Sequence, residues 1–325
     1  MTGRYRRLLG AFAAVGLFAA LAACGGGSDD SGASAGGGSI KKIPALEGVT
    51  FKLSDKTYTE NALNEKMTAL ALEAAGAKVD YLPSFAAAEA ARQALVAGQI
   101  DMYWEGMASG WVGYLGNSEP FDTVDAMYAA LSKQDLEENG IKWLPPAPFN
   151  DTYAIAAKSE TADDLGVHSL SDLANLTKTN PDEATICIET EFQTRNDGLP
   201  GMSKAYGMDF PSDNVKVVDA GVVYTEVAKA DTCNFGEIYS TDGRVKGLGL
   251  TVLDDDKGFF PIYNPALTMK NSLFEKYPEI EDLMAPIQAK WTADVQTALN
   301  AKVDVDGETV DQVAEDWMKE QGFIG

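Results

Sequence analysis

The sequence has few of the residues and patterns on which enzyme active sites depend. His168 is its single histidine and lies just before a helix-start pattern at 169–172, so a capping or surface role is favoured over a general base. No G-x-S-x-G, P-loop or G-x-G-x-x-G pattern occurs. The run Asp254–Asp256 matches no calcium loop and is better explained as a solvated acidic turn. We therefore expect a protein that is not an enzyme and that holds no metal or cofactor.

Long apolar runs are lacking after the first residues. Arg4, Arg6 and Arg7 precede an apolar stretch of about 15 residues at 8–22, shorter than the roughly 20 that span a bilayer as a helix. The small residues before Cys24 form a lipobox. The alternative, a cysteine buried in an apolar leader, does not explain the Gly/Ser/Asp-rich segment that follows. We predict a signal peptide at 1–23 and a lipid on Cys24 that anchors the protein at the outer face of the cytoplasmic membrane.

The segment after Cys24 has no apolar periodicity up to Ser39, so it cannot bury a hydrophobic face. We predict a flexible, lipidated tether at 24–45 and a folded body that begins near Leu46. The rest of the chain is long enough for one large domain or two medium domains with substantial cores.

Cysteine is scarce. After Cys24 only Cys187 and Cys233 remain. Cys187 lies in the strand-like run 185–188 and Cys233 precedes the apolar run 235–239, so neighbouring strands would bring them within reach of each other. Because thiols oxidise outside the cytoplasm, we predict a disulfide. Two buried thiols without a bond are the alternative.

Positive charge is scarce as well. Lysine and arginine number 26 against 49 aspartates and glutamates, which gives a net charge of −23 at pH 7. An acidic body repels phosphate backbones, so we expect no nucleic-acid partner. The charge does not identify a ligand by itself, since a solvated surface accounts for it.

What the sequence does contain is a regular alternation of strand and helix patterns. Thr57 and Glu60 form a capping-box pattern before the first helix, and the chain is strongly helical from Ser272. This alternation is typical of α/β layers around a largely parallel sheet. Strand-like runs lie at 49–53, 78–82, 100–104, 152–157, 184–188, 215–218 and 235–239.

A proline-rich break at 145–148 divides the pattern into two halves. We predict two α/β lobes, 46–149 plus 262–325 and 150–261, joined by chain crossings near Phe149 and Phe260. Two crossings allow a hinge, and a cleft between hinged lobes can enclose a small ligand.

Aromatic residues gather near the ends of the strand-like runs, where α/β clefts bind ligands. Five of them are Tyr103, Trp104, Tyr153, Tyr239 and Tyr263. Ring faces attract quaternary ammonium ions, with about 0.5–2 kcal/mol for each desolvated contact. For any single tyrosine a core position is the alternative, but together these residues predict an aromatic cage.

Three segments of the sequence resemble a known family. Residues 191–201 (EFQTRNDGLPG), 239–244 and 253–264 are similar to segments of extracytoplasmic substrate-binding proteins of ABC importers for glycine betaine, carnitine and choline. The resemblance extends over nearly the whole body. It implies a two-lobed, type II periplasmic-binding-protein fold and a receptor that delivers a quaternary ammonium compatible solute, such as glycine betaine, to an ABC permease in the membrane for osmoprotection. We expect a monomer.

By matching position, the resemblance implies that Tyr153, Tyr239 and Tyr263 are residues of an aromatic box that surrounds a trimethylammonium head. Asp151 resembles the acidic residue beside that box.

The resemblance also implies that Arg195 holds the ligand carboxylate. A planar guanidinium can pair with a carboxylate through two hydrogen bonds, so choline should bind more weakly than carboxylated betaines. A structural arginine that bonds backbone carbonyls is the alternative. Lys56 resembles a first-lobe lysine that faces the ligand.

One segment departs from the family pattern. Relatives often read Y-P-E-Y-T-G-T, where this chain has YWEGMAS at 103–109. Gly106 thus replaces a box tyrosine, and Ser109 replaces a threonine that helps to hold the carboxylate. Either Tyr103, Trp104 or Trp111 supplies the lost ring, or the pocket takes a different solute, such as an amino acid or a polyamine. A lipid-anchored envelope enzyme is a more distant alternative.

Overall fold

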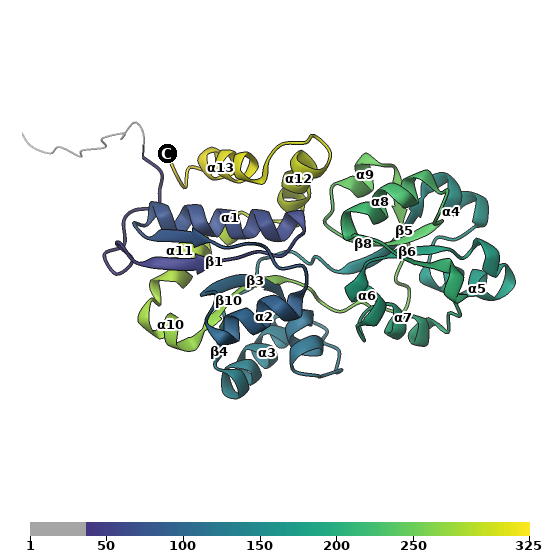
Figure 1. The fold of residues 1–325 in the computed structure, drawn as a ribbon, viewed down its shortest axis with the longest axis horizontal. Coiled ribbons are helices and arrows are strands. Elements are labelled where there is room, and N and C mark those ends of the chain that lie inside the picture. Colours follow the sequence, from purple (N-terminus) through teal and green to yellow (C-terminus); the bar gives the residue numbers. More distant parts are fainter. Residues whose placement is uncertain (1–36) are drawn as a thin grey trace, which may run out of the picture. The chain divides into compact units, whose positions relative to one another are not determined.

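The computed structural model describes residues 37–325 (Figure 1). The predicted signal peptide, Cys24 and the first part of the predicted tether lie outside the described residues. Two five-stranded sheets organise the described chain, and each is flanked by its own helices.

The first sheet has the strand order β2-β1-β3-β10-β4. Strands β1, β2 and β3 run parallel, whereas β10 is antiparallel to β3 and β4. We call this sheet and its helices lobe 1. Its strands are β1 (Thr50–Leu53), β2 (Lys78–Tyr81), β3 (Met102–Gly106), β4 (Ile141–Trp143) and β10 (Pro265–Lys270). Its helices are α1 (Thr59–Ala74), α2 (Ala88–Ala97), α3 (Val124–Asn139), α10 (Asn271–Lys276), α11 (Glu279–Gln288), α12 (Ala293–Asp304) and α13 (Val310–Glu320).

The second sheet has the strand order β7-β6-β8-β5-β9. Strand β6 runs parallel to β7 and β8, whereas β5 is antiparallel to β8 and β9. We call this sheet and its helices lobe 2. Its strands are β5 (Tyr153–Lys158), β6 (Ile186–Ile188), β7 (Val215–Val217), β8 (Phe235–Tyr239) and β9 (Leu250–Val252). Its helices are α4 (Ser159–Leu165), α5 (Leu170–Thr179), α6 (Thr190–Thr194), α7 (Leu199–Tyr206), α8 (Ala220–Lys229) and α9 (Arg244–Gly247).

The chain passes between the lobes twice, through residues 144–152 and 253–264. The two-lobed α/β fold predicted from the sequence is confirmed, but both sheets are mixed and not largely parallel. The strand pattern missed β4, β9 and β10. Strand β10 enters lobe 1 from lobe 2 and lies antiparallel between β3 and β4, so the return crossing itself makes the first sheet mixed.

The folded body begins before Leu46. The amides of Ser39 and Ile40 donate to the carbonyls of residues 322 and 323, with N···O distances of 2.7 and 3.1 Å, and the amide of Ile43 donates to residue 75 at 2.8 Å. Ile40 and Ile43 also pack on the core of lobe 1. The prediction of a tether as far as residue 45 is therefore wrong for residues 39–43, because two isoleucines are enough to bind this segment to the body.

The predicted disulfide between Cys187 and Cys233 is present, with Cα atoms 5.6 Å apart. Cys187 lies in β6 and Cys233 lies two residues before β8, and these two strands are parallel neighbours. The bond is buried in the core of lobe 2 and joins two central strands at the end remote from Tyr239.

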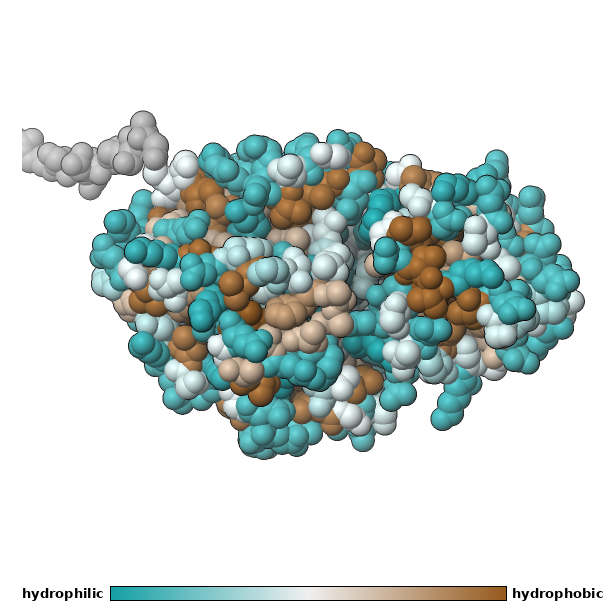
Figure 2. Space-filling model, in the orientation of Figure 1, coloured by the Kyte–Doolittle hydropathy of each residue, from teal (hydrophilic) through white to brown (hydrophobic). Residues whose placement is uncertain are grey.

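Hydrophilic side chains cover much of the face drawn in Figure 2, in keeping with the acidic composition. Hydrophobic side chains are scattered among them. Within residues 37–325, no helix combines the length and the apolar character needed to cross a membrane.

Candidate functional site

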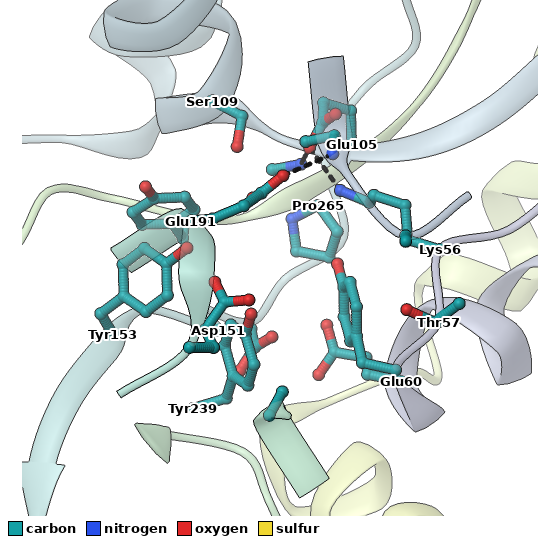
Figure 3. A pocket seen from close by; sticks show the side chains of 17 residues that line it. Lys56, Thr57, Glu60, Glu105, Ser109, Asp151, Tyr153, Glu191, Tyr239 and Pro265 are labelled. Atoms are coloured by element: carbon teal, nitrogen blue, oxygen red, sulfur yellow. Dashed lines mark hydrogen bonds and ion pairs between the residues drawn. The ribbon is translucent and has the colours of Figure 1, made fainter. Parts of the chain in front are cut away.

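A cavity lies between the two lobes, at the ends of their central strands (Figure 3). Its volume is about 680 Å³, including the space at its mouth. About 70 Å³ of this space can hold the centre of a water molecule. The side chains that line it are Lys56, Thr57, Tyr58, Glu60, Ala86, Ala88, Glu105, Gly106, Ser109, Asp151, Tyr153, Glu189, Glu191, Ala220, Tyr239, Tyr263 and Pro265.

Four tyrosine rings line the cavity in a continuous row. The rings of Tyr58 and Tyr239 are stacked, with centroids 5.3 Å apart and planes inclined by 14°. Tyr239 is stacked in turn with Tyr153, at 5.4 Å and 29°. Tyr153 meets Tyr263 edge to face at 5.3 Å. The row therefore runs from lobe 1, through lobe 2, to the second crossing segment.

The sheet of lobe 2 positions two of these rings. Tyr153 is the first residue of β5 and Tyr239 is the last residue of β8, and the antiparallel register places them directly opposite each other. Side chains of directly opposed residues lie on the same face of a sheet, within contact distance. The two rings therefore stack at the ends of β5 and β8 that face the cavity.

An ion pair from lobe 1 lies at the other end of the cavity (Figure 3). Lys56 Nζ lies 2.6 Å from Glu105 Oε1, and both side chains are buried. Glu105 also accepts hydrogen bonds from the Tyr114 hydroxyl and the Gly106 amide. Burial alone would raise the pKa of Glu105, but the charge and hydrogen bond of Lys56 hold it below the ordinary value. Ser109 lines the cavity beside this pair.

A second polar cluster joins the two lobes. The Thr241 Oγ1 atom lies 2.5 Å from Glu60 Oε2 and 2.6 Å from Asp151 Oδ1. All three residues are buried. Burial raises the pKa of Glu60 well above its ordinary value, and the charge of Asp151 raises it further. Burial also raises the pKa of Asp151, to about 6.

Three further carboxylates from lobe 2 lie at or behind the cavity wall. Burial and a neighbouring glutamate raise the pKa of Glu189 to about 7 and that of Glu237 to about 8. Glu191 accepts a hydrogen bond of 2.6 Å from the amide of Ala88, which links lobe 2 to lobe 1. The cavity therefore has more acidic than basic side chains, and its lysine is already paired.

Arg195 does not line the cavity. Its Nε and Nη2 atoms each donate to Asp197 at 2.8 Å, and Nη2 also donates to the Tyr263 hydroxyl at 2.8 Å. The bidentate pairing that we predicted with a ligand carboxylate is thus made with Asp197. In this structure Arg195 lies behind Tyr263 and braces it.

The structure does not bring Tyr103 or Trp104 to the cavity. Strand β3 is buried on both faces, so these consecutive side chains enter two different cores. Trp104 packs edge-on against Trp291, with centroids 5.3 Å apart. Trp111, the third candidate for the missing ring, donates to the carbonyl of residue 119 and does not line the cavity either.

Gly106 does line the cavity, and the ring of Tyr263 covers it. A Cβ atom at this position would lie 2.8 Å from Cδ1 of Tyr263, closer than carbon atoms pack. A larger residue at 106 therefore requires Tyr263 to move. The glycine allows the Tyr263 ring to enter the space that a side chain at 106 would take.

Four residues of the site were not predicted from the sequence: Tyr58, Glu60, Glu105 and Thr241. The predicted capping box is also wrong, because α1 begins at Thr59 after Tyr58, which makes no side-chain cap. The side chain of Glu60 faces lobe 2 and not its own helix terminus. A signal was available, since Tyr58 and Glu60 follow the carboxyl end of a parallel strand, where ligand sites gather.

The chain is similar to known substrate-binding proteins. Residues 49–320 match the family model for the substrate-binding domain of an ABC-type glycine betaine transport system. The chain is 35% identical over 280 residues to a glycine-betaine-binding protein of Pseudomonas aeruginosa, which covers 85% of this chain and 89% of the relative. It is 31% identical over 230 residues to an ergothioneine transport permease/ergothioneine binding protein, EgtU, of Helicobacter pylori, over 71% of this chain and 40% of that one.

Among solved structures, apo YehZ from Escherichia coli is similar over 85% of this chain and 99% of that one, with 29% identity and a TM-score of 0.61. The family model and the Pseudomonas relative both cover more than four fifths of the chain. The chain therefore belongs to the family of substrate-binding domains of ABC-type glycine betaine transport systems.

Proposed function

We propose that the ligand of this protein is a quaternary ammonium compatible solute, glycine betaine or a related betaine. Family membership makes the chain an extracytoplasmic solute-binding protein of an ABC importer and not an enzyme. The observation that carries the ligand proposal is the row of four tyrosine rings in a cavity with an excess of carboxylates. The ring faces favour a bulky cation that donates no hydrogen bond, and the carboxylates favour a cation over an anion.

The trimethylammonium group binds against the ring faces of Tyr153, Tyr239 and Tyr263, with Tyr58 as a fourth ring. Each desolvated cation–π contact contributes about 0.5–2 kcal/mol. Asp151 lies beside the rings and adds negative potential. Tyr239 stacks on both Tyr58 and Tyr153, at 5.3 and 5.4 Å, so a cation can lie between either pair of rings only after they separate. Ligand binding therefore requires a small movement of the lobes or of Tyr58.

The ligand carboxylate binds at the other end of the cavity, near Lys56 and Ser109 (Figure 3). An ammonium group has three donors, and Lys56 uses one of them for Glu105. The hydroxyl of Ser109 is a further donor at the cavity wall. Arg195 acts on this site through Tyr263, which it holds in place.

The protein works with a membrane permease, and we propose that it does so as a monomer held at the membrane by a lipid on Cys24. The lipobox before Cys24 and the apolar leader at 8–22 support the anchor. Mass spectrometry of the protein from its native membrane tests it: a diacylglycerol-modified N-terminal Cys24 is expected, and an unmodified Met1 contradicts it.

Calorimetric titration of the purified protein with glycine betaine, carnitine, choline and ergothioneine tests the ligand class. We include ergothioneine because it is itself a trimethylammonium betaine and because one relative is named an ergothioneine binding protein. Saturable binding of at least one betaine, lost in Tyr239→Ala, is expected. Tyr81→Ala, which removes a half-exposed tyrosine outside the cavity, is the matched control and should bind normally. Binding of amino acids or polyamines with no betaine binding would overturn the proposal.

A further inference from the structure

The contacts among Glu60, Thr241 and Asp151 require a bound proton. A threonine hydroxyl has one hydrogen and can donate only one hydrogen bond. Thr241 Oγ1 lies 2.5 and 2.6 Å from carboxyl oxygens of Glu60 and Asp151. If both groups were ionised, one of these short contacts would join two oxygen atoms with no hydrogen between them. One carboxyl must therefore be protonated and donate to Thr241, while Thr241 donates to the other.

No cation in contact with the pair replaces this proton. Glu60 and Asp151 form no ion pair within residues 37–325. The groups that face them are the hydroxyl of Tyr58, the amide of Asn300 in α12, and Asp242 after β8. Two buried carboxylates without a cation would repel each other strongly, which favours retention of the proton.

The nearby charges do not alter this conclusion, because they are paired with each other. Arg244 binds Asp242 through Nε and Nη2, at 2.9 and 2.5 Å, and its Nε lies 3.9 Å from Asp304. Lys56 is paired with Glu105.

The protonated pair bridges the two lobes. Glu60 lies in the first turn of α1 in lobe 1, whereas Thr241 follows β8 of lobe 2 and Asp151 precedes β5. The Thr241 carbonyl also accepts from Asn300 Nδ2 of α12 at 3.1 Å, so this loop is bound to lobe 1 on two sides. Loss of the proton replaces a hydrogen bond between the lobes with repulsion between two carboxylates.

We infer that Glu60, Thr241 and Asp151 form a proton-dependent latch, which holds the lobes together when the carboxyl pair keeps its proton and releases them when the proton is lost. The latch regulates the cavity to which the proposed function assigns the ligand, so its consequence for transport rests on that function. The geometry of the latch does not depend on the proposed function.

The sign of the pH dependence follows from linkage. Separation of the lobes exposes both carboxyls to water, where their pKa values are about 4. In the closed arrangement burial raises the pKa of Glu60, and that of Asp151 to about 6. A raised pKa stabilises the closed arrangement at low pH, and this stabilisation is lost as pH rises through the raised value. The ratio of closed to open molecules should therefore fall at least about tenfold between pH 5 and pH 8.

Energy transfer between two fluorophores measures this ratio without a ligand. The full chain, with Cys24→Ser, carries Val96→Cys in lobe 1 and Val222→Cys in lobe 2, two exposed positions. Transfer should fall from pH 5 to pH 8 in this parent. In Glu60→Gln, whose amide donates at every pH, transfer should stay high and independent of pH.

Glu191→Gln is the matched control. The carboxylate of Glu191 also joins the lobes, but it accepts from the amide of Ala88 and needs no proton. The amide oxygen of glutamine can still accept from Ala88, so this variant should keep both the transfer level and the pH dependence of the parent. A parent whose transfer does not change with pH, or a Glu60→Gln variant that keeps the parent's slope, would overturn the latch.

A separate titration with glycine betaine and carnitine at pH 5 and pH 8 distinguishes the two proposals. Failure of both betaines to bind at either pH contradicts the proposed function but leaves the energy-transfer result valid. Betaine binding together with pH-independent transfer in the parent contradicts the latch alone.

Discussion

The end of β3 in lobe 1 and the ends of β5 and β8 in lobe 2 face the same cavity but present opposite chemistry to it. Both regions are rich in aromatic residues in the sequence. In lobe 2, Tyr153 and Tyr239 are terminal residues of their strands and their rings line the cavity. In lobe 1, Tyr103 and Trp104 lie within β3 and enter the cores, so the strand presents Glu105 and Gly106 instead.

The difference shows that a ring near a strand end serves a site only when it lies on the last residue before the cavity. One or two residues earlier, a strand covered by helices on both faces directs each side chain into a hydrophobic core. An aromatic-rich segment therefore predicts where a site lies more reliably than it predicts which residues form the site. Mutations at matched positions of the two regions test this distinction.

The largest effect is expected for Trp104→Ala, which should lower the free energy of unfolding by about 3–5 kcal/mol. Trp104 is fully buried, packs against Trp291 and donates to Thr68 Oγ1 at 2.8 Å. Urea denaturation measures the loss. A change below about 1 kcal/mol would mean that Trp104 is not a core residue, and the contrast between the two regions would fail.

The next largest effect is expected for Tyr153→Ala, on ligand affinity. Loss of one desolvated cation–π contact of about 2 kcal/mol weakens binding about 30-fold. Calorimetry with glycine betaine and choline should give similar losses, because both contain the trimethylammonium group. Unchanged affinity for both ligands would show that the lobe 2 rings do not contact the ligand.

Replacement of the bracing arginine, Arg195→Lys, should weaken glycine betaine and choline by the same factor, about tenfold. Lysine cannot bind Asp197 and Tyr263 with the geometry of a guanidinium, so Tyr263 loses its support. The ratio of the two affinities is the informative quantity. A loss confined to glycine betaine would instead indicate a direct contact between Arg195 and the ligand carboxylate, as the family resemblance implies.

A smaller effect is expected for Ser109→Ala at the lobe 1 end of the cavity. One hydrogen bond contributes about 1 kcal/mol, so carboxylated ligands should bind about fivefold more weakly. Choline should be unaffected at this position. Equal losses for choline and glycine betaine would contradict the assignment of this end of the cavity to the carboxylate.

The smallest effect is expected for Tyr103→Phe, with less than about a twofold change in the affinity for any ligand. The Tyr103 hydroxyl is buried and lacks a hydrogen-bond partner among residues 37–325, so its removal should be neutral or slightly stabilising. A substantial loss of affinity would show that β3 contributes a ring to the site after all.

Much of the architecture followed from the sequence because it rests on local patterns. Alternating strand and helix patterns predicted two α/β lobes, and the scarcity of cysteine predicted the disulfide. Three strands were missed. Strands β4 and β9 have only three residues each, whereas β10 has six and depends on the return of the chain from lobe 2.

The sequence by itself determined the acidic composition, the alternation of elements, the family segments and the tyrosines at the ends of β5 and β8. These features depend on residue type and on spacing along the chain. The tertiary structure alone decided that Arg195 binds the hydroxyl of Tyr263, that Tyr263 covers Gly106, and that Glu60 shares a proton-dependent contact with Thr241, 181 residues away. Contacts of this kind form between elements that only the packing of the two lobes brings together, and their protonation depends on how deeply that packing buries them.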